Sequence, residues 1–432
     1  MKFSLRHQST GVVYPYLAQA AHLMVRGFFR KIYISNRDAV PVDKPVLLAA
    51  NHPTAFVDPC LLGIFLNPPL YNMTRGDVFR KPFFRKLMES INMFPVFRMR
   101  DGFRGRDRNQ EVFEFCEKKL LEKRVVTIYV EGEHHLEKRV RPIQKGILRI
   151  AFDTFEKHQL NDLQIIPAGC NYVWGDRPRD EAMVCVGTPI LVRDYWETYR
   201  TNPAGAMTQL ATDIESALKK VCLHIDDPGD AELLEMLLAL RRNEHADHFV
   251  PVVSFSHDRF AREKAVCDAL NQLNAKEKQQ LKKSVSSYFE ALEQAGLTDA
   301  GLLQPQFAGW HWPLFFLIGF VPFVPGYLTS RPVVWFAAFV AKKTVKKREF
   351  QSSVFMGAGF FGGILYYLIW LLACLVSRNP WWITFALTLP ALGWFSMIYR
   401  EYLARWMAAR RAQTHPGRAV LLELRNKIQE PW

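Results

Sequence analysis

A histidine and an aspartate in the first part of the chain have the chemistry of an acid–base pair. His52 follows the apolar run 45–50, which is typical of a buried strand, and Asp58 comes six positions later. A histidine held by a carboxylate can remove a proton from a hydroxyl group near neutral pH. No serine or cysteine nucleophile of recognisable context accompanies the pair, so the activated hydroxyl could belong to the substrate.

The spacing of the pair excludes one continuous helix with both side chains on the same face, because each helical residue turns by about 100°. Pro53 removes this difficulty. The residue before a proline is disfavoured in helical conformation, and proline itself suits a first helical turn. His52 in a loop could then meet Asp58 on the helix that follows. A plain strand-to-helix turn with an ordinary histidine explains the two residues equally well.

Three later segments could take part in the same site. Arg98 ends an apolar run, and its forked guanidinium group suits phosphate oxygens. Glu131 and Gly132 follow a second apolar run and offer an acceptor for hydroxyl groups beside a flexible backbone. Pro167 lies at the end of a third run, where it could line a channel. Taken alone, Glu131-Gly132 is by default a plain turn, and the segment 166–169 is explained as part of the structure alone.

The elements that must position these residues alternate between β-rich runs and helical patterns across residues 32–200. This alternation predicts an α/β domain with a largely buried sheet, and binding residues in such sheets collect beyond the strand ends. The candidate strands are Val46–Ala50, Leu70–Met73, Val125–Val130, Gln164–Ile166 and Met183–Val186, and the helical patterns lie around 59–65, 82–91, 110–121 and 145–155.

Helical patterns flank the α/β domain on both sides. Residues 1–31 contain an amphipathic helix that could pack on a core or lie on a membrane surface. Residues 201–305 combine helical periodicity with dense charge, which predicts a helical connecting region.

The part of the chain at 306–411 has the composition of a membrane region. Ser353–Val376 and Pro380–Ile398 are uncharged stretches of 24 and 19 residues, which predict a transmembrane helical hairpin. Basic residues flank both outer ends, so the positive-inside rule places these ends and the α/β domain on the cytoplasmic face. The segment 310–328 contains three prolines and two glycines and is expected to be interfacial or re-entrant. A basic tail, 412–432, ends the chain.

The charge and cysteine content of the chain limit the kinds of molecule that it is expected to bind. The net charge of +14 fits nucleic acid or anionic lipid. Nucleic-acid binding does not explain the hairpin, so we expect anionic membrane lipids and no nucleic acid. The seven cysteines include no Cys-x-x-Cys pair, which argues against a structural zinc site or a disulfide framework. The adjacent His134 and His135 need not converge, and no metal site is predicted.

The order of four motifs carries a family resemblance. Asn-His-Pro with Asp-Pro at 51–59, Pro-Val-Phe-Arg at 95–98, Glu-Gly at 131–132 and Ile-Pro at 166–167 resemble the successive motifs of the glycerophospholipid acyltransferase family. That family includes glycerol-3-phosphate and 1-acylglycerol-3-phosphate acyltransferases. The resemblance covers roughly residues 30–195.

This resemblance implies an O-acyltransferase of phospholipid synthesis. Such an enzyme moves a fatty acyl group from an acyl-CoA or acyl carrier protein thioester to a hydroxyl of glycerol 3-phosphate or a lysophospholipid, with no tightly bound cofactor. The resemblance assigns two catalytic residues, the general base His52 and its orienting partner Asp58. The binding residues that it assigns are Arg98 for the acceptor phosphate, Glu131 and Gly132 for the glycerol phosphate, and Pro167 on the acyl-donor side.

Two departures from the family pattern matter. Five residues separate His52 from Asp58, whereas the usual motif has four, and this predicts a subgroup. The third motif carries Glu133 where the family usually has a threonine. An extra carboxylate repels a phosphate unless basic residues between 138 and 141 compensate for it.

Two other functions remain open on the sequence. The altered third motif fits a lipid-binding or scaffold protein with an inactive acyltransferase-like domain. The second function is thioester hydrolysis with Cys60 as the nucleophile. The ordinary explanation of Cys60 is a small buried side chain.

Overall fold

The computed structural model describes residues 14–76, 79, 82–96, 105–245 and 248–428, which form two compact units. The α/β unit comprises Met1–His224, Val252–Phe260 and Lys347–Ser353. The helical unit comprises Ile225–Pro251, Ala261–Lys346 and Val354–Trp432.

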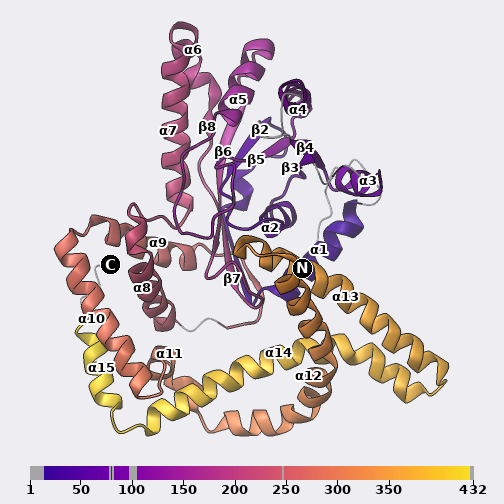
Figure 1. Cartoon of the computed structure of the whole chain (residues 1–432), viewed down its shortest axis with the longest axis vertical. Helices are drawn as coiled ribbons and strands as arrows, with labels where there is room; N and C mark the ends of the chain where they lie inside the picture. The colour runs from indigo at the N-terminus through magenta and orange to yellow at the C-terminus, as the bar shows by residue number, and fades with distance from the viewer. Residues whose placement is uncertain (1–13, 77–78, 80–81, 97–104, 246–247, 429–432) are drawn as a thin grey trace. The chain divides into compact units, whose positions relative to one another are not determined.

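The α/β unit is built on a nine-stranded sheet with the order β4-β3-β5-β2-β6-β7-β1-β9, in which β8 also pairs with β6 (Figure 1). The neighbours from β4 to β6 run parallel, β7 is antiparallel to β6, and β1 is parallel to both β7 and β9. The carboxyl ends of the five parallel strands therefore meet at one edge of the sheet. The strands are β1 Lys31–Ser35, β2 Val46–Ala50, β3 Leu70–Arg75, β4 Met93–Val96, β5 Val125–Tyr129, β6 Gln164–Tyr172, β7 Glu181–Val186, β8 Ile190–Leu191 and β9 Val253–Ser254.

Helices cover this sheet. Every residue of β2 and β6 is buried, as expected for strands whose two faces both carry helices. Helices α5 and α7 pack on β2, α4 packs on β5, and α2 packs on β3. The helices of the unit are α1 Tyr14–Phe28, α2 Val57–Phe65, α3 Pro82–Ser90, α4 Gly105–Leu121, α5 Lys145–His158, α6 Trp196–Thr201 and α7 Pro203–Val221.

The predicted α/β class is confirmed, and a strand is present at each of the five candidate positions. Sequence reasoning missed β1, β4, β8 and β9, which are short or lack a clear alternating pattern. The unit also extends beyond the predicted range 32–200. The reason is that α7 buries Leu210, Ile214 and Leu218 where it packs on the sheet, and β9 pairs with β1.

The helical unit holds a buried polar network around Asp299. This carboxylate accepts hydrogen bonds from Tyr288 Oη at 2.6 Å and Asn243 Nδ2 at 2.9 Å, and Arg425 Nε lies 3.3 Å away. Because these groups come from four helices, the network fixes their packing. The shorter helices here are α8 Ala231–Glu244, α9 Asp258–Gln272, α10 Ala275–Gln294, α11 Asp299–Leu303 and α15 Arg418–Asn426.

Three helices of this region are long and apolar enough to cross a membrane: α12 His311–Thr344, α13 Arg348–Val376 and α14 Pro380–Thr414. The last two form the two helices of the predicted hairpin. The segment 310–328, expected to be interfacial or re-entrant, lies within the continuous helix α12, which runs through three internal prolines. Gly326 lies so close to α14 that a Cβ there would come within 2.1 Å of the Leu392 carbonyl oxygen. Small residues at such crossings are typical of membrane helices.

Candidate active site

The histidine–aspartate pair forms at the carboxyl end of β2. The chain leaves β2 at Ala50 and enters α2 at Val57, so His52 lies in the loop and Asp58 in the first turn of the helix. His52 Nδ1 lies 2.7 Å from Asp58 Oδ2. The geometry expected from Pro53 is therefore present, and the pair is a hydrogen-bonded imidazole and carboxylate.

Asp58 is held by a complete set of donors. Its side chain is fully buried, and it accepts hydrogen bonds from the Thr54 backbone N–H at 2.9 Å and from Thr54 Oγ1 at 2.7 Å. The Tyr172 hydroxyl donates a further bond to Asp58 Oδ1. Burial, together with the nearby Asp58 charge, raises the pKa of Tyr172 well above its ordinary value, so this phenol stays a donor. A buried carboxylate needs such partners to remain ionised.

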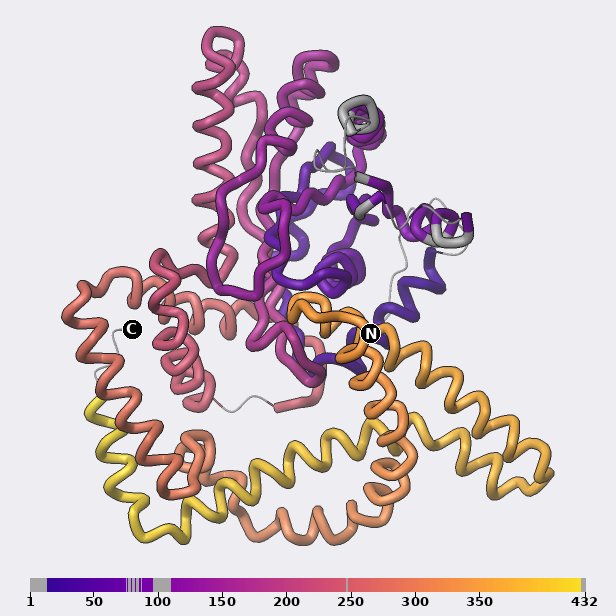
Figure 2. Tube along the Cα trace, in the orientation of Figure 1, coloured from indigo at the N-terminus to yellow at the C-terminus, as the bar shows by residue number. Residues whose placement is uncertain are grey.

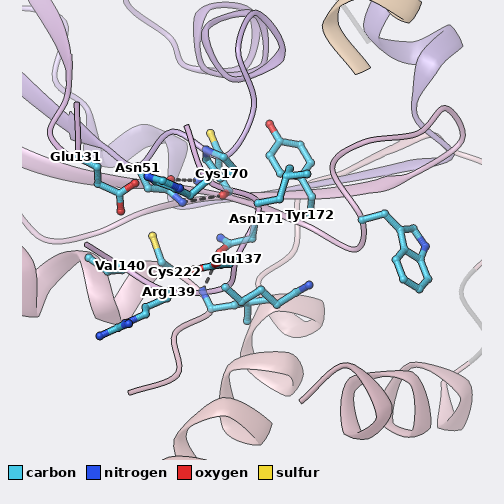
Figure 3. Close-up of a pocket in the computed structure, with 15 residues that line it drawn as sticks. Asn51, Glu131, Glu137, Arg139, Val140, Cys170, Asn171, Tyr172 and Cys222 are labelled. Carbon is cyan, nitrogen blue, oxygen red and sulfur yellow. Dashed lines mark hydrogen bonds between the residues drawn. The ribbon is translucent and has the colours of Figure 1, made fainter. Parts of the chain in front are cut away.

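Asn51 connects residues 51–56, the candidate catalytic loop, to the neighbouring strand. Its Nδ2 donates to the Cys170 carbonyl at 3.0 Å, and the Cys170 N–H donates to Asn51 Oδ1 at 2.7 Å. Because Cys170 lies in β6, this amide joins the ends of β2 and β6 directly before His52. Figure 3 shows the two hydrogen bonds.

Aromatic rings surround the catalytic imidazole. The ring of His52 stacks on Tyr129, with centroids 3.7 Å apart and planes 14° from parallel. His134 also contacts it, at a centroid distance of 4.1 Å. These rings leave only 14% of the His52 side chain exposed. Packing of this kind limits the rotation of the imidazole.

Glu131 lies beside the loop that carries His52, two residues after the end of β5. Its carboxylate is buried and accepts a hydrogen bond from the Arg141 backbone N–H at 3.1 Å. The backbone of His52 donates to it as well. Burial raises the pKa of Glu131 to about 7, against the lowering effect of these two bonds. Gly132 follows with a φ of 73°, a conformation that favours glycine.

A cavity of about 20 Å³ separates Glu131 from β6. Asn51, Cys170 and Asn171 lie on the same cavity, and Figure 3 shows their side chains with that of Glu131. A volume of this size holds about one water molecule. The cavity is therefore too small for a lipid or a thioester in this structure.

The remaining predicted site residues have different placements. Pro167 lies within β6, opposite Ala49 of β2 and next to Gly187, and not at the strand end. Arg98 lies outside the residues that the structure describes. The structure therefore brings together His52, Asp58 and Glu131, with Gly132 adjacent to the last.

Several charged side chains in the loop after Glu131 have partners nearby. Glu133 lies 4.0 Å from His135, and Arg141 pairs with Glu137 at 2.6 Å. Lys138 donates to the Val173 carbonyl at 3.2 Å. Across the described parts of the chain, no three His, Cys, Asp or Glu side chains gather as a metal site.

Cys60 is placed poorly for nucleophilic attack. It is buried in α2, and burial, with the negative charge of Asp58, raises the pKa of its thiol far above the ordinary value. Because the thiolate is the nucleophile, a thiol that stays protonated is unreactive. The geometry therefore disfavours a cysteine hydrolase.

Sequence reasoning missed three groups that support the pair, Thr54, Tyr172 and Asn51. Thr54 and Asn51 lie within the first motif, and their short side chains next to a strand end are a signal that could have been used. Tyr172 lies 114 residues from Asp58, and no spacing in the sequence points to it.

Comparison with known proteins relates part of the α/β unit to acyltransferases. Residues 31–171 match the family model described as Acyltransferase. Glycerol-3-phosphate O-acyltransferase 2 of Saccharomyces cerevisiae is 27% identical over 135 residues, which cover 31% of this chain and 18% of that protein. An uncharacterised acyltransferase of Schizosaccharomyces pombe is 24% identical over 144 residues, 33% of this chain and 21% of that protein.

The chain thus spans only about a fifth of the length of these curated relatives. Among solved structures, the 1-acyl-sn-glycerophosphate acyltransferase PlsC of Thermotoga maritima matches 48% of this chain and 78% of its own, with 12% identity and a TM-score of 0.37.

The comparisons thus support membership of residues 31–171, within the α/β unit, in the acyltransferase family. The resemblance of this segment to the glycerophospholipid acyltransferases, first seen in the four motifs, is confirmed at the level of the family. The subgroup suggested by the spacing of His52 and Asp58 stays a prediction.

Proposed function

We propose that the protein is a membrane-bound O-acyltransferase that transfers a fatty acyl group from an acyl thioester to glycerol 3-phosphate or 1-acylglycerol 3-phosphate. The donor is acyl-CoA or an acyl carrier protein thioester. The observation that carries the proposal is the 2.7 Å contact between His52 Nδ1 and the buried Asp58, within an acyltransferase-family domain.

The proposed reaction uses the substrate hydroxyl as the nucleophile. His52 Nε2 takes the hydroxyl proton as the acceptor oxygen attacks the thioester carbonyl carbon. The tetrahedral intermediate collapses, the carbon–sulfur bond breaks, and the imidazolium returns the proton to the departing thiolate. Asp58 holds the Nδ1–H tautomer and stabilises the imidazolium, as the carboxylate does in a catalytic triad.

The remaining roles come from the family resemblance. Arg98 binds the acceptor phosphate, Glu131 and Gly132 help to bind the glycerol phosphate, and Pro167 belongs to the acyl-donor side. The position of Glu131 supports its proposed role in binding the acceptor. Its carboxylate accepts a hydrogen bond from the backbone N–H of His52 and therefore lies next to the proposed base.

A membrane location suits a lipid acceptor. Three apolar helices are long enough to cross a bilayer, and basic residues flank the predicted hairpin. We propose that these flanks bind anionic lipid on the cytoplasmic face, where the α/β unit then acts.

His52→Ala tests the proposal. Purified protein in lipid nanodiscs receives labelled acyl-CoA or acyl carrier protein thioester, with glycerol 3-phosphate and 1-acylglycerol 3-phosphate as separate acceptors. We expect the variant to lose transfer by about 10³–10⁴-fold or more, as triad enzymes do, and to remain in the membrane fraction. His158→Ala, on α5 and paired with Glu117, is the control and should keep activity. Transfer retained by His52→Ala would show that His52 is not the base.

The alternative function is a lipid-binding or scaffold protein with an inactive domain, and Glu133 in the third motif is the feature that favours it. The same assay separates the two functions. Wild-type protein that binds anionic vesicles but transfers no acyl group to either acceptor supports the scaffold.

A further inference from the structure

The first residues of α13 belong to the α/β unit and contact the catalytic loop. The segment Lys347–Ser353 is part of that unit, although it lies almost three hundred residues after His52. Figure 2 shows the orange trace of this segment beside the indigo trace of the catalytic loop and α2. None of the four family motifs includes it.

Two backbone donors of the catalytic loop are satisfied by this segment. The Ala55 N–H donates to the Glu349 carbonyl at 3.3 Å, and the Phe56 N–H donates to Ser353 Oγ at 2.8 Å. Ala55 and Phe56 lie between His52 and Asp58. Backbone N–H groups outside a strand cannot pair with a neighbouring strand and need other acceptors. The start of α13 supplies acceptors for two such groups in the loop that carries the pair.

An aromatic contact connects the same segment to the catalytic imidazole. Phe350 packs on His134 with ring centroids 5.0 Å apart, and His134 packs on His52 at 4.1 Å. Tyr129 stacks on His52 as well. The four rings form a row in which Phe350 supports His134 and His134 supports the base.

An ion pair anchors the start of the segment. Arg348 Nε lies 2.9 Å from Asp176 Oδ2, in the loop that follows β6. Although burial raises the pKa of Asp176, hydrogen bonds from Arg348 and Arg177 outweigh it and leave the value below its ordinary range. The same loop begins just after Tyr172, the donor to Asp58. The segment is thus attached to the loop that follows Tyr172 as well as to the loop between His52 and Asp58.

We propose that Arg348–Ser353 is a positioning element of the active site, in which Phe350 and Ser353 hold His52 and its loop in the reactive geometry. This inference rests on the proposed acyl transfer. The helix α13 continues without a break from Ser353 into an apolar stretch that ends at Val376.

The test compares Phe350→Ala with two matched variants, in full-length protein in lipid nanodiscs. Misplacement of a reacting group by about 1 Å can lower the rate about 10²-fold. We expect Phe350→Ala to lower kcat about 10–100-fold, with KM for both substrates changed less than about 3-fold. Phe350→Tyr keeps the ring and should restore kcat. Phe361→Ala removes an exposed phenylalanine further along the same helix and should behave as wild type.

A second readout does not depend on acyl transfer. Diethyl pyrocarbonate modifies accessible imidazoles, and peptide mass spectrometry gives the rate at His52 alone. We expect a several-fold faster modification of His52 in Phe350→Ala, and no change in Phe361→Ala. Ser353→Ala removes one acceptor and keeps the helix, so it reports on the same element if Phe350→Ala is poorly folded.

Unchanged kcat and unchanged His52 modification in both Phe350→Ala and Ser353→Ala would overturn the inference. A fall in kcat that Phe350→Tyr fails to restore would also count against it, because it would indicate general damage. If wild-type protein transfers no acyl group, the proposed function fails, and the modification rates alone decide whether α13 holds His52.

Discussion

Tyr172→Phe removes one oxygen atom and so tests the buried hydrogen bonds that hold Asp58. The Tyr172 hydroxyl donates to Asp58 Oδ1, which would then keep only the 2.7 Å bond from Thr54 Oγ1. A hydrogen bond to a charged group contributes about 1.5–3 kcal/mol. For a unit of this size, 1 kcal/mol shifts Tm by about 2–4 °C, so thermal unfolding should occur about 3–12 °C lower.

Activity should fall with the same perturbation. If about 1.5 kcal/mol of this interaction is also lost in the transition state, kcat falls about ten-fold. That is far less than the ~10⁴-fold loss expected from removal of the carboxylate itself.

A matched control exists in the same unit. Tyr195 Oη donates to Asp213 Oδ2 at 2.6 Å, which is the same chemistry outside the catalytic loop. Tyr195→Phe should lower Tm by a smaller amount, because this pair is only partly buried, and should leave kcat unchanged. Equal effects of the two substitutions on kcat would refute the reasoning, since the network would then act on stability alone.

Two further predictions follow from individual pKa values. Because burial raises the pKa of Glu131 to about 7, the folded chain retains a proton that the unfolded chain has released, and stability falls as pH rises from about 4.5 to 7. The fall is about 3 kcal/mol, and chemical denaturation of Glu131→Gln at several pH values should show a flatter profile. Burial and the Asp58 charge raise the pKa of the Cys60 thiol, so Cys60→Ala should keep acyl transfer within about 3-fold. Loss of all turnover in Cys60→Ala, with turnover kept in His52→Ala, would instead favour the hydrolase.

The elements that carry the pair could be predicted because their signals are local. The apolar run before His52 gave the central strand β2, and Pro53 indicated the change from loop to helix that lets His52 reach Asp58. The long uncharged stretches likewise gave α13 and α14. The internal prolines of α12 do not interrupt it, since a helix that packs along a neighbour can continue through them.

The partners of the pair could not be predicted, because they are set by strand register and by contacts between distant segments. Tyr172 reaches Asp58 only because β6 pairs with β2 so that Ala168 lies opposite Ala50, which places the end of β6 beside the catalytic loop. Ser353 meets Phe56 across 297 residues of sequence. Periodicity and spacing carry no information about either contact.

The contacts of α13 fall within the five residues that separate His52 from Asp58. Five residues between His52 and Asp58 make a longer loop than the usual four, and a longer loop exposes additional backbone donors. The Ala55 and Phe56 N–H groups find their acceptors on Glu349 and Ser353. The start of α13 therefore supplies acceptors to two backbone donors that lie between the paired side chains, within the longer spacing of this motif.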